Sequence, residues 1–200
     1  WKWLTALDEN QCEEIFQRYE KYVKYLCYEV SGKRWVSKGA AIHMFFAPVL
    51  NKVFPCSNVV RLRRNPEQSV PSLASLITSY RKIYCPNADL NVIGEFSLDL
   101  FREAVFRTAR TSTSCISSSS IDIEYQNLVD DPINTLKSIY DRFGYEINDS
   151  LTVAWKSYLE SHGKDKLPRH RYDSDIFGIS PERLKSIVHE LRPLNSNLLA

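Results

Sequence analysis

Short apolar runs alternate with amphipathic stretches of helical length along this chain, and this alternation constrains the fold more than any other feature. The apolar runs are strand candidates at 34–37, 58–62 and 121–125. Strands separated by helices of about ten residues or more pair in parallel through right-handed crossovers. The sequence therefore predicts an α/β fold with a mainly parallel sheet flanked by helices.

Capping residues and prolines mark the ends of the expected helices. One helix is expected to begin after Asp8, because apolar residues then recur at helical spacing, and others are expected over 42–53 and 96–109 and around Trp155. Three more are expected to begin at a capping residue followed by proline, which suits the first helical turn. These pairs are Asn65-Pro66, Asp131-Pro132 and Ser180-Pro181.

The length of 200 residues is sufficient for one folded domain, and 44% hydrophobic with 25% charged residues is typical of a globular chain. We therefore expect a single α/β domain over residues 1–200. Residues 111–120 are rich in serine and threonine, which favours a flexible surface connection within that domain.

Charge and composition argue against several classes of partner. The formal net charge of +2 is too balanced to predict nucleic-acid binding. No apolar stretch approaches the ~20 residues of a membrane span, and residues 1–8 lack the architecture of a signal peptide, so we expect a cytoplasmic protein without a membrane span. The five cysteines show no C-x-x-C spacing, which argues against zinc and favours buried, reduced thiols.

Glycine is scarce, with six residues in the whole chain. Neither the G-x-x-x-x-G-K-[ST] pattern nor the G-x-G-x-x-G pattern can be written across them. The sequence therefore predicts that this chain holds no self-contained Walker or Rossmann phosphate site.

A candidate anion site lies between residues 58 and 72. The strand candidate runs into Arg63 and Arg64, and a helix that starts with proline follows. Ligands of α/β proteins bind at the carboxyl ends of strands, so Arg64 and the hydroxyl of Ser72, about two turns into the helix, are candidates to hold one phosphate. The alternative, that strand-end arginines are merely solvated, stays open on residue types alone.

The same stretch resembles a family signature. Arg64, Pro66 and Ser72 have the spacing by which sulfotransferases bind the 3′-phosphate of the sulfate donor 3′-phosphoadenylyl sulfate (PAPS). Three further stretches resemble that family in the same order along the chain. They are Arg34 to Lys38 with His43 and Phe54-Pro55, then Tyr125 to Pro132, and then His170-Arg171-Tyr172 followed by Phe177-Gly178-Ile179.

The resemblance implies roles in binding the donor. It implies that Arg64 and Ser72 hold the 3′-phosphate and that Tyr125 lies beside the adenine. It also implies that a late basic segment closes over the donor's phosphates, although a solvated loop is an equal alternative for that segment. The residues of this segment that we expect to bind the donor are His170, Arg171 and Tyr172.

Two residues are implied in the transfer itself. Lys38 is expected near the transferred sulfuryl group, where its ammonium can offset charge that develops on the bridging oxygen. His43 is the candidate general base for the acceptor, with a packed or capping histidine as the alternative. The proline that usually follows the lysine in the family is absent, because the run here is Lys38-Gly39-Ala40.

The resemblance implies a P-loop nucleoside-triphosphatase-like sulfotransferase architecture, of which this chain is expected to be the C-terminal portion. The family's glycine-containing loop for the 5′-phosphosulfate has no counterpart here. The implied enzyme moves a sulfuryl group from PAPS, without a metal, to a hydroxyl or amine of a small-molecule or glycan acceptor, and this chain alone is expected to transfer little or none. A non-catalytic scaffold and a nucleotide kinase-like enzyme are the alternatives.

Overall fold

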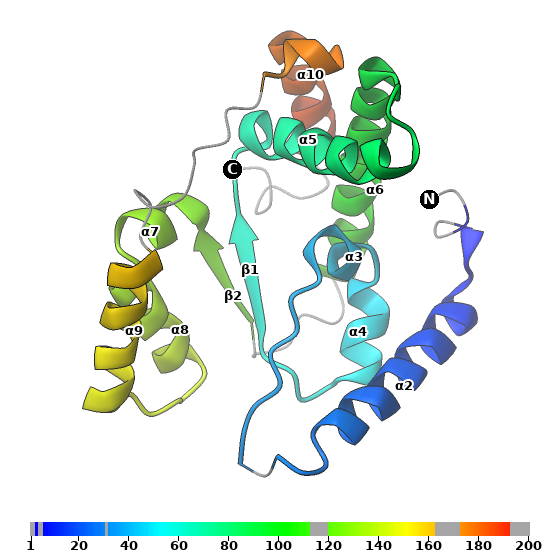
Figure 1. The fold of residues 1–200 in the computed structure, drawn as a ribbon. Coiled ribbons are helices and arrows are strands. Elements are labelled where there is room, and N and C mark those ends of the chain that lie inside the picture. The colour runs from blue at the N-terminus through cyan, green and yellow to red at the C-terminus, as the bar shows by residue number, and fades with distance from the viewer. Residues whose placement is uncertain (1–2, 4–5, 31, 113–119, 163–172, 193–200) are drawn as a thin grey trace. The chain divides into compact units, whose positions relative to one another are not determined.

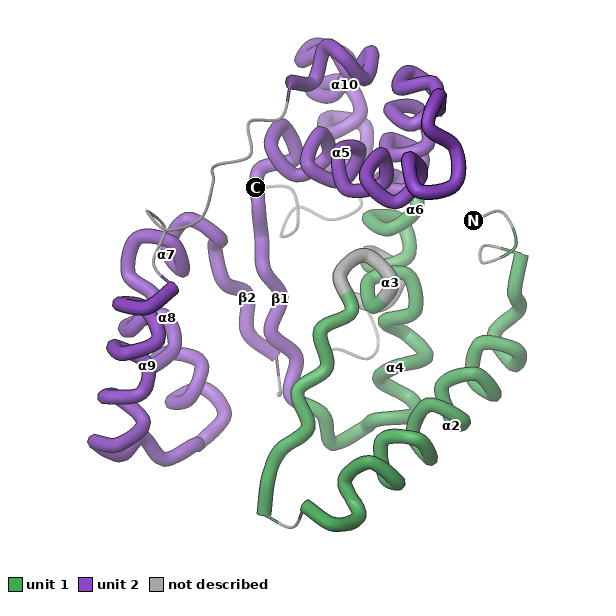
Figure 2. Tube along the Cα trace, viewed as in Figure 1, with its two compact units in different colours: residues 1–57, 103–117 green, residues 58–102, 118–200 purple. Residues whose placement is uncertain are grey.

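The computed structural model describes residues 3, 6–30, 32–112, 120–162 and 173–192 (Figure 1). The chain divides into two compact units, one formed by 1–57 and 103–117 and the other by 58–102 and 118–200 (Figure 2). We describe each unit by itself. The expectation of a single domain over 1–200 stays a prediction.

Unit 1 is helical. It contains α2 (Glu9–Leu26), α3 (Ala40–Phe45), α4 (Ala47–Val53) and the C-terminal part of α6 (Leu90–Ser112). The helix α2 begins as expected after Asp8, whose side chain accepts a hydrogen bond from the backbone N–H of Gln11 in a capping box. The buried side chains of unit 1 include Cys12, Phe16, Phe45, Phe46, Val49, Ala104 and Val105.

Two expectations for unit 1 are wrong. Residues 34–37 form no strand, and their side chains are exposed, with 86% of Val36 accessible. A strand needs a paired neighbour, and β-prone residue types cannot supply one. The expected helix over 42–53 is two helices, because Pro48 has no N–H to donate to the carbonyl of Met44. The hydroxyl of Thr108 donates to that carbonyl instead, at 3.4 Å.

Unit 2 contains the sheet. The strands β1 (Val59–Arg63) and β2 (Ser120–Glu124) pair in parallel, with Val59 opposite Ser120 and Arg63 opposite Glu124. β2 leads directly into the short helix α7 (Tyr125–Asp130), and α8 (Pro132–Arg142) follows. The prediction of an α/β fold with a parallel sheet is confirmed, within a chain that is mostly helical.

The remaining helices of unit 2 are α5 (Pro66–Tyr84), the N-terminal part of α6, α9 (Asp149–His162), the short 3₁₀ helix η2 (Asp175–Phe177) and α10 (Pro181–Leu191). All three predicted caps are confirmed, because the side chains of Asn65, Asp131 and Ser180 accept hydrogen bonds from backbone N–H groups in the first turns. The buried side chains of this unit include Val70, Ala74, Ile93, Leu98, Phe177, Ile179, Leu184, Ile187 and Leu191.

Two further expectations concern the serine-rich connection and the cysteine thiols. Residues 113–119 of the expected connection lie outside the described residues, while Ser112 ends α6 and Ser120 opens β2. The expectation of buried thiols is wrong for Cys56 and Cys85, which are exposed, and right for Cys12. Across the residues that the structure describes, no helix is both long and apolar enough to cross a bilayer.

Candidate functional site

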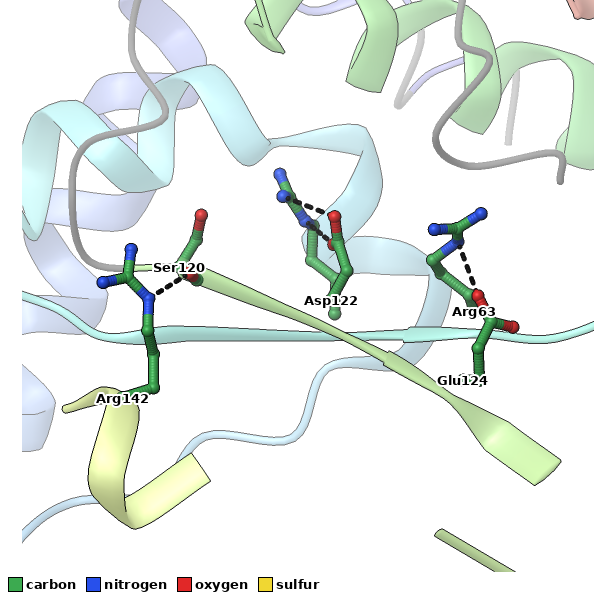
Figure 3. A network of polar contacts seen from close by, with 6 residues as sticks. Arg63, Ser120, Asp122, Glu124 and Arg142 are labelled. Carbon is green, nitrogen blue, oxygen red and sulfur yellow. Dashed lines mark hydrogen bonds and ion pairs between the residues drawn. The ribbon is translucent and has the colours of Figure 1, made fainter. Parts of the chain in front are cut away.

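The arginines of β1 face carboxylates of β2 across the sheet. The guanidinium of Arg61 donates to both carboxylate oxygens of Asp122, at 2.5 and 3.1 Å. Arg63 Nε lies 3.1 Å from Glu124 Oε1, an ion pair without hydrogen-bond geometry (Figure 3). Both pairs follow from the parallel register, which sets 61 opposite 122 and 63 opposite 124. These two arginines are therefore already neutralised within the sheet.

Arg64 differs from them. Its guanidinium carbon lies 4.7 Å from the centroid of the Tyr125 ring, in a cation–π contact. Arg64 directly follows β1 and Tyr125 directly follows β2, so the pairing of Arg63 with Glu124 brings these next two residues side by side. Arg64 Nε is buried and has no hydrogen-bond partner, and no carboxylate among the described residues pairs with this side chain. Two residues that sequence reasoning assigned to the donor therefore meet at the carboxyl end of the sheet.

Ser72 lies two turns into α5 and is half-buried. No contact in the described part of the chain joins its hydroxyl to Arg64. The first turn of α5 is already capped, since Asn65 Oδ1 accepts from the N–H of Glu67 at 2.9 Å, and the N–H groups of Gln68 and Ser69 bond to the Asn65 carbonyl. Any anion held here must therefore rely on the side chains of Arg64 and Ser72 and not on free N–H groups of that turn.

The two residues expected in transfer belong to unit 1. Lys38 is exposed in the irregular segment before α3, and His43 lies within α3. Burial of the imidazole lowers the pKa of His43. His43 Nε2 lies 3.5 Å from the hydroxyl of Ser37, which lies 3.0 Å from the hydroxyl of Tyr19. Tyr19 and Ser37 were missed by sequence reasoning, because no spacing rule links a helix residue to a loop residue eighteen positions later.

The structure describes only part of the motif that runs from His170 to Ile179. His170, Arg171 and Tyr172 lie outside the described residues, so their expected contacts with the donor stay a prediction. The segment that follows them forms part of the core, with Phe177 3% and Ile179 1% exposed. Gly178 between them adopts φ +64°, a left-handed conformation that suits glycine.

A pocket that the sequence did not suggest lies between the start of α5 and the end of α10. Its volume is about 500 Å³. Lys185 Nζ within it lies 3.9 Å from Glu67 Oε1. The lining residues are Asn65, Pro66, Glu67, Lys185, Val188, His189 and Arg192.

Comparison with known proteins decides the family. A family model described as "Sulfotransferase family" matches residues 1–149. The chain belongs to the sulfotransferase family. Among solved structures, the crystal structure of sulfotransferase STF9 from Mycobacterium avium matches with a TM-score of 0.78 at 20% sequence identity. This likeness supports the sulfotransferase fold.

The matched regions differ in extent. The alignment covers 95% of this chain and 48% of the STF9 chain, so this sulfotransferase chain spans about half the length of that structure. No significant match was found among curated proteins.

Proposed function

We propose that this chain supplies the nucleotide side of the donor site in an enzyme that transfers a sulfuryl group from PAPS to a hydroxyl or amine. One observation carries the proposal. Arg64 meets Tyr125 at the carboxyl end of the sheet, and it has no acidic partner among the described residues, whereas Arg61 and Arg63 do. A cation left without a counterion at that edge is suited to bind an anion.

Each proposed donor contact has a chemical reason. The guanidinium of Arg64 presents a fork of N–H donors that matches a phosphate, and the Ser72 hydroxyl adds a further donor. The Tyr125 ring offers a flat apolar face beside which an adenine can lie. The cation–π contact of the same ring with Arg64 orients the guanidinium. The donor's 3′-phosphate would therefore bind Arg64 and Ser72, with the adenine beside Tyr125.

The transfer itself is an in-line displacement. The acceptor oxygen or nitrogen forms a bond to sulfur as the bond from sulfur to the bridging phosphate oxygen breaks, and 3′-phosphoadenosine 5′-phosphate leaves. We assign the acceptor's proton to His43 and charge compensation on the leaving oxygen to Lys38. A lowered pKa suits His43 to this role, because the imidazole is then unprotonated at neutral pH and able to accept a proton.

Binding of 3′-phosphoadenosine 5′-phosphate, measured by calorimetry, tests the donor site. Loss of charge-assisted hydrogen bonds worth ~1.5–3 kcal/mol should raise the Kd of Arg64→Ala by roughly 10- to 150-fold. Arg64→Lys should lie between, because it keeps the charge but loses the fork. Arg81→Ala is the matched control, since it removes the same charge from an exposed position late in α5.

Two results would contradict the proposal. One is an Arg64→Ala variant that binds the nucleotide as tightly as the parent chain. The other is an equal loss in Arg64→Ala and Arg81→Ala, which would show only a general effect of charge. Tight binding that depends on Arg64, without release of the nucleotide from PAPS by the natural full-length protein, would favour the non-catalytic scaffold instead.

A further inference from the structure

A chain of side-chain hydroxyls in unit 1 ends at the imidazole of His43. The hydroxyls of Tyr19 and Ser37 lie 3.0 Å apart, and Ser37 Oγ lies 3.5 Å from His43 Nε2. The three residues come from α2, from the irregular segment before α3, and from α3. The contacts therefore link three separate parts of the chain, and Ser37 joins Tyr19 to the ring nitrogen of His43.

Aromatic packing fixes the first member of this chain. The ring of Tyr19 is half-buried, and it packs edge-on against Phe16 at 6.4 Å and against Phe54 at 6.1 Å between centroids. These two contacts restrict the Tyr19 ring, so its hydroxyl has a defined position. The tyrosine can therefore orient Ser37, whose own side chain is exposed and otherwise free to rotate.

The backbone fixes the last member. A Cβ at position 39 would overlap the imidazole of His43 at Cδ2, Nε2 and Cγ, so the ring occupies the space that the missing side chain of Gly39 leaves. The N–H of His43 also bonds to the Gly39 carbonyl, at 3.4 Å. The ring is held against Gly39 while its Nε2 is directed to Ser37.

We propose that Tyr19 and Ser37 are positioning residues for His43, and that they hold the proton of the neutral imidazole on Nε2 so that Nδ1 accepts the proton of the acceptor. Nε2–H donates to Ser37 Oγ, and the Ser37 hydroxyl donates to Tyr19 Oη. The same bonds persist after proton transfer, because Nε2–H stays a donor in the imidazolium. This inference rests on the proposed function, which assigns the role of base to His43.

Nitrogen NMR of His43 in the 200-residue chain tests the hydroxyl chain without any need for turnover. The parent should show one neutral tautomer, protonated on Nε2, and Ser37→Val should show a mixture of both tautomers. Ser37→Thr should restore the parent spectrum, because threonine and valine differ in the hydroxyl and match in shape. Tyr19→Phe should shift toward the mixture, while Tyr22→Phe on the exposed face of α2 should not.

Turnover of PAPS by the natural full-length protein tests the catalytic part. A positioned general base supplies roughly 100- to 10,000-fold, and partial loss of its orientation in Tyr19→Phe should lower kcat by roughly tenfold with little change in the KM for PAPS. Tyr22→Phe should keep the parent kcat. Tyr19→Phe with the parent kcat would overturn the positioning role.

The two readouts separate this inference from the proposed function. A His43 spectrum that is the same in Ser37→Val and Ser37→Thr overturns the hydroxyl chain, whatever the activity. A spectrum that responds as expected, in a full-length protein whose parent form transfers no sulfuryl group, overturns the proposed function and with it the catalytic role of the chain.

Discussion

Gly94 lies where α6 meets the segment around η2, and alanine at this position should destabilise unit 2. A Cβ there would collide with the carbonyl oxygen of Phe177, and it would lie 3.0 Å from the carbonyl carbon and 3.2 Å from Cβ of that residue. The obstacle is backbone, which cannot rotate away as a side chain can. The segment would have to move from α6 and expose part of Phe177, which is only 3% accessible.

The expected size is the difference of two effects. Overpacking of a filled core costs ~1–3 kcal/mol, and displacing a fully buried phenylalanine side chain risks a similar amount. Alanine in place of glycine in a helix interior returns ~1 kcal/mol. We therefore expect Gly94→Ala to lower the free energy of unfolding by about 3 kcal/mol, or Tm by about 6–12 °C for a chain of this length.

Thermal unfolding followed by circular dichroism measures this change. Gly144→Ala is the control, because it also adds a Cβ but meets nothing within 4 Å. At a φ of +65°, an alanine at position 144 is destabilising by about 1 kcal/mol through backbone strain alone, because its Cβ collides with nothing. A Gly94→Ala variant as stable as the parent chain, or more stable than it, would refute the argument, because helix propensity would then outweigh the contact with Phe177.

Two further predictions concern ion pairs of unit 2. A double-mutant cycle of Arg61→Gln and Asp122→Asn in urea should give a coupling energy of about 1 kcal/mol or less, because both side chains are nearly a third exposed. A coupling energy well above that value would contradict the expectation that solvent screens the pair. The hydrogen bonds from Arg183 lower the pKa of Glu95 in the folded protein. The ionised Glu95 carboxylate therefore stabilises the fold above the pKa that it has in the unfolded chain, and this stabilisation is lost as pH falls through its lower pKa in the folded protein. The stability difference between the parent and Glu95→Gln should therefore be constant near neutral pH and shrink below about pH 4, as unfolding midpoints across pH would show; a difference independent of pH would contradict this.

Local chemistry made much of the fold predictable. The caps at Asn65, Asp131 and Ser180 were correctly expected because a capping side chain bonds to N–H groups two or three residues away, which sequence alone displays. The inward positions of α10 at Leu184 and Ile187 follow equally from helical spacing.

The predictions that were wrong depended on contacts with residues distant in sequence. The segment 34–37 has strand-forming residues, but no strand pairs with it among the described residues. On α5, helical spacing also allows a second apolar stripe that carries Leu76 and Tyr80, yet these side chains are 50% and 63% exposed, because α5 buries the face that carries Val70 and Ala74. Helical spacing identifies the apolar stripes on a helix, whereas the packing of neighbouring elements determines which stripe is buried.

In the candidate site, too, local motifs were predictable and contacts between distant residues were not. Arg64 and Tyr125 were each expected near the donor from their motifs, but their mutual contact requires the pairing of two strands that lie 61 residues apart in sequence. The hydroxyl chain to His43 could not be expected at all, since Tyr19 reaches it only after α2 has packed through Phe16 and Phe54.

The ion pairs of the sheet have one consequence for how Arg64 and Tyr125 come together during folding. A slip of β1 against β2 by one residue would set Arg61 opposite an isoleucine and Arg63 opposite an isoleucine or Tyr125, so both ion pairs would be lost. A slip by two would keep one pair, and it would carry Arg64 about 6.6 Å along the strand from Tyr125. Only the native alignment satisfies both arginines and also joins Arg64 to Tyr125. The charges inside the sheet thus select the alignment that brings Arg64 to Tyr125, so substitution of Arg61 or Arg63 should weaken the nucleotide binding proposed for Arg64, even though neither residue contacts the nucleotide in that proposal.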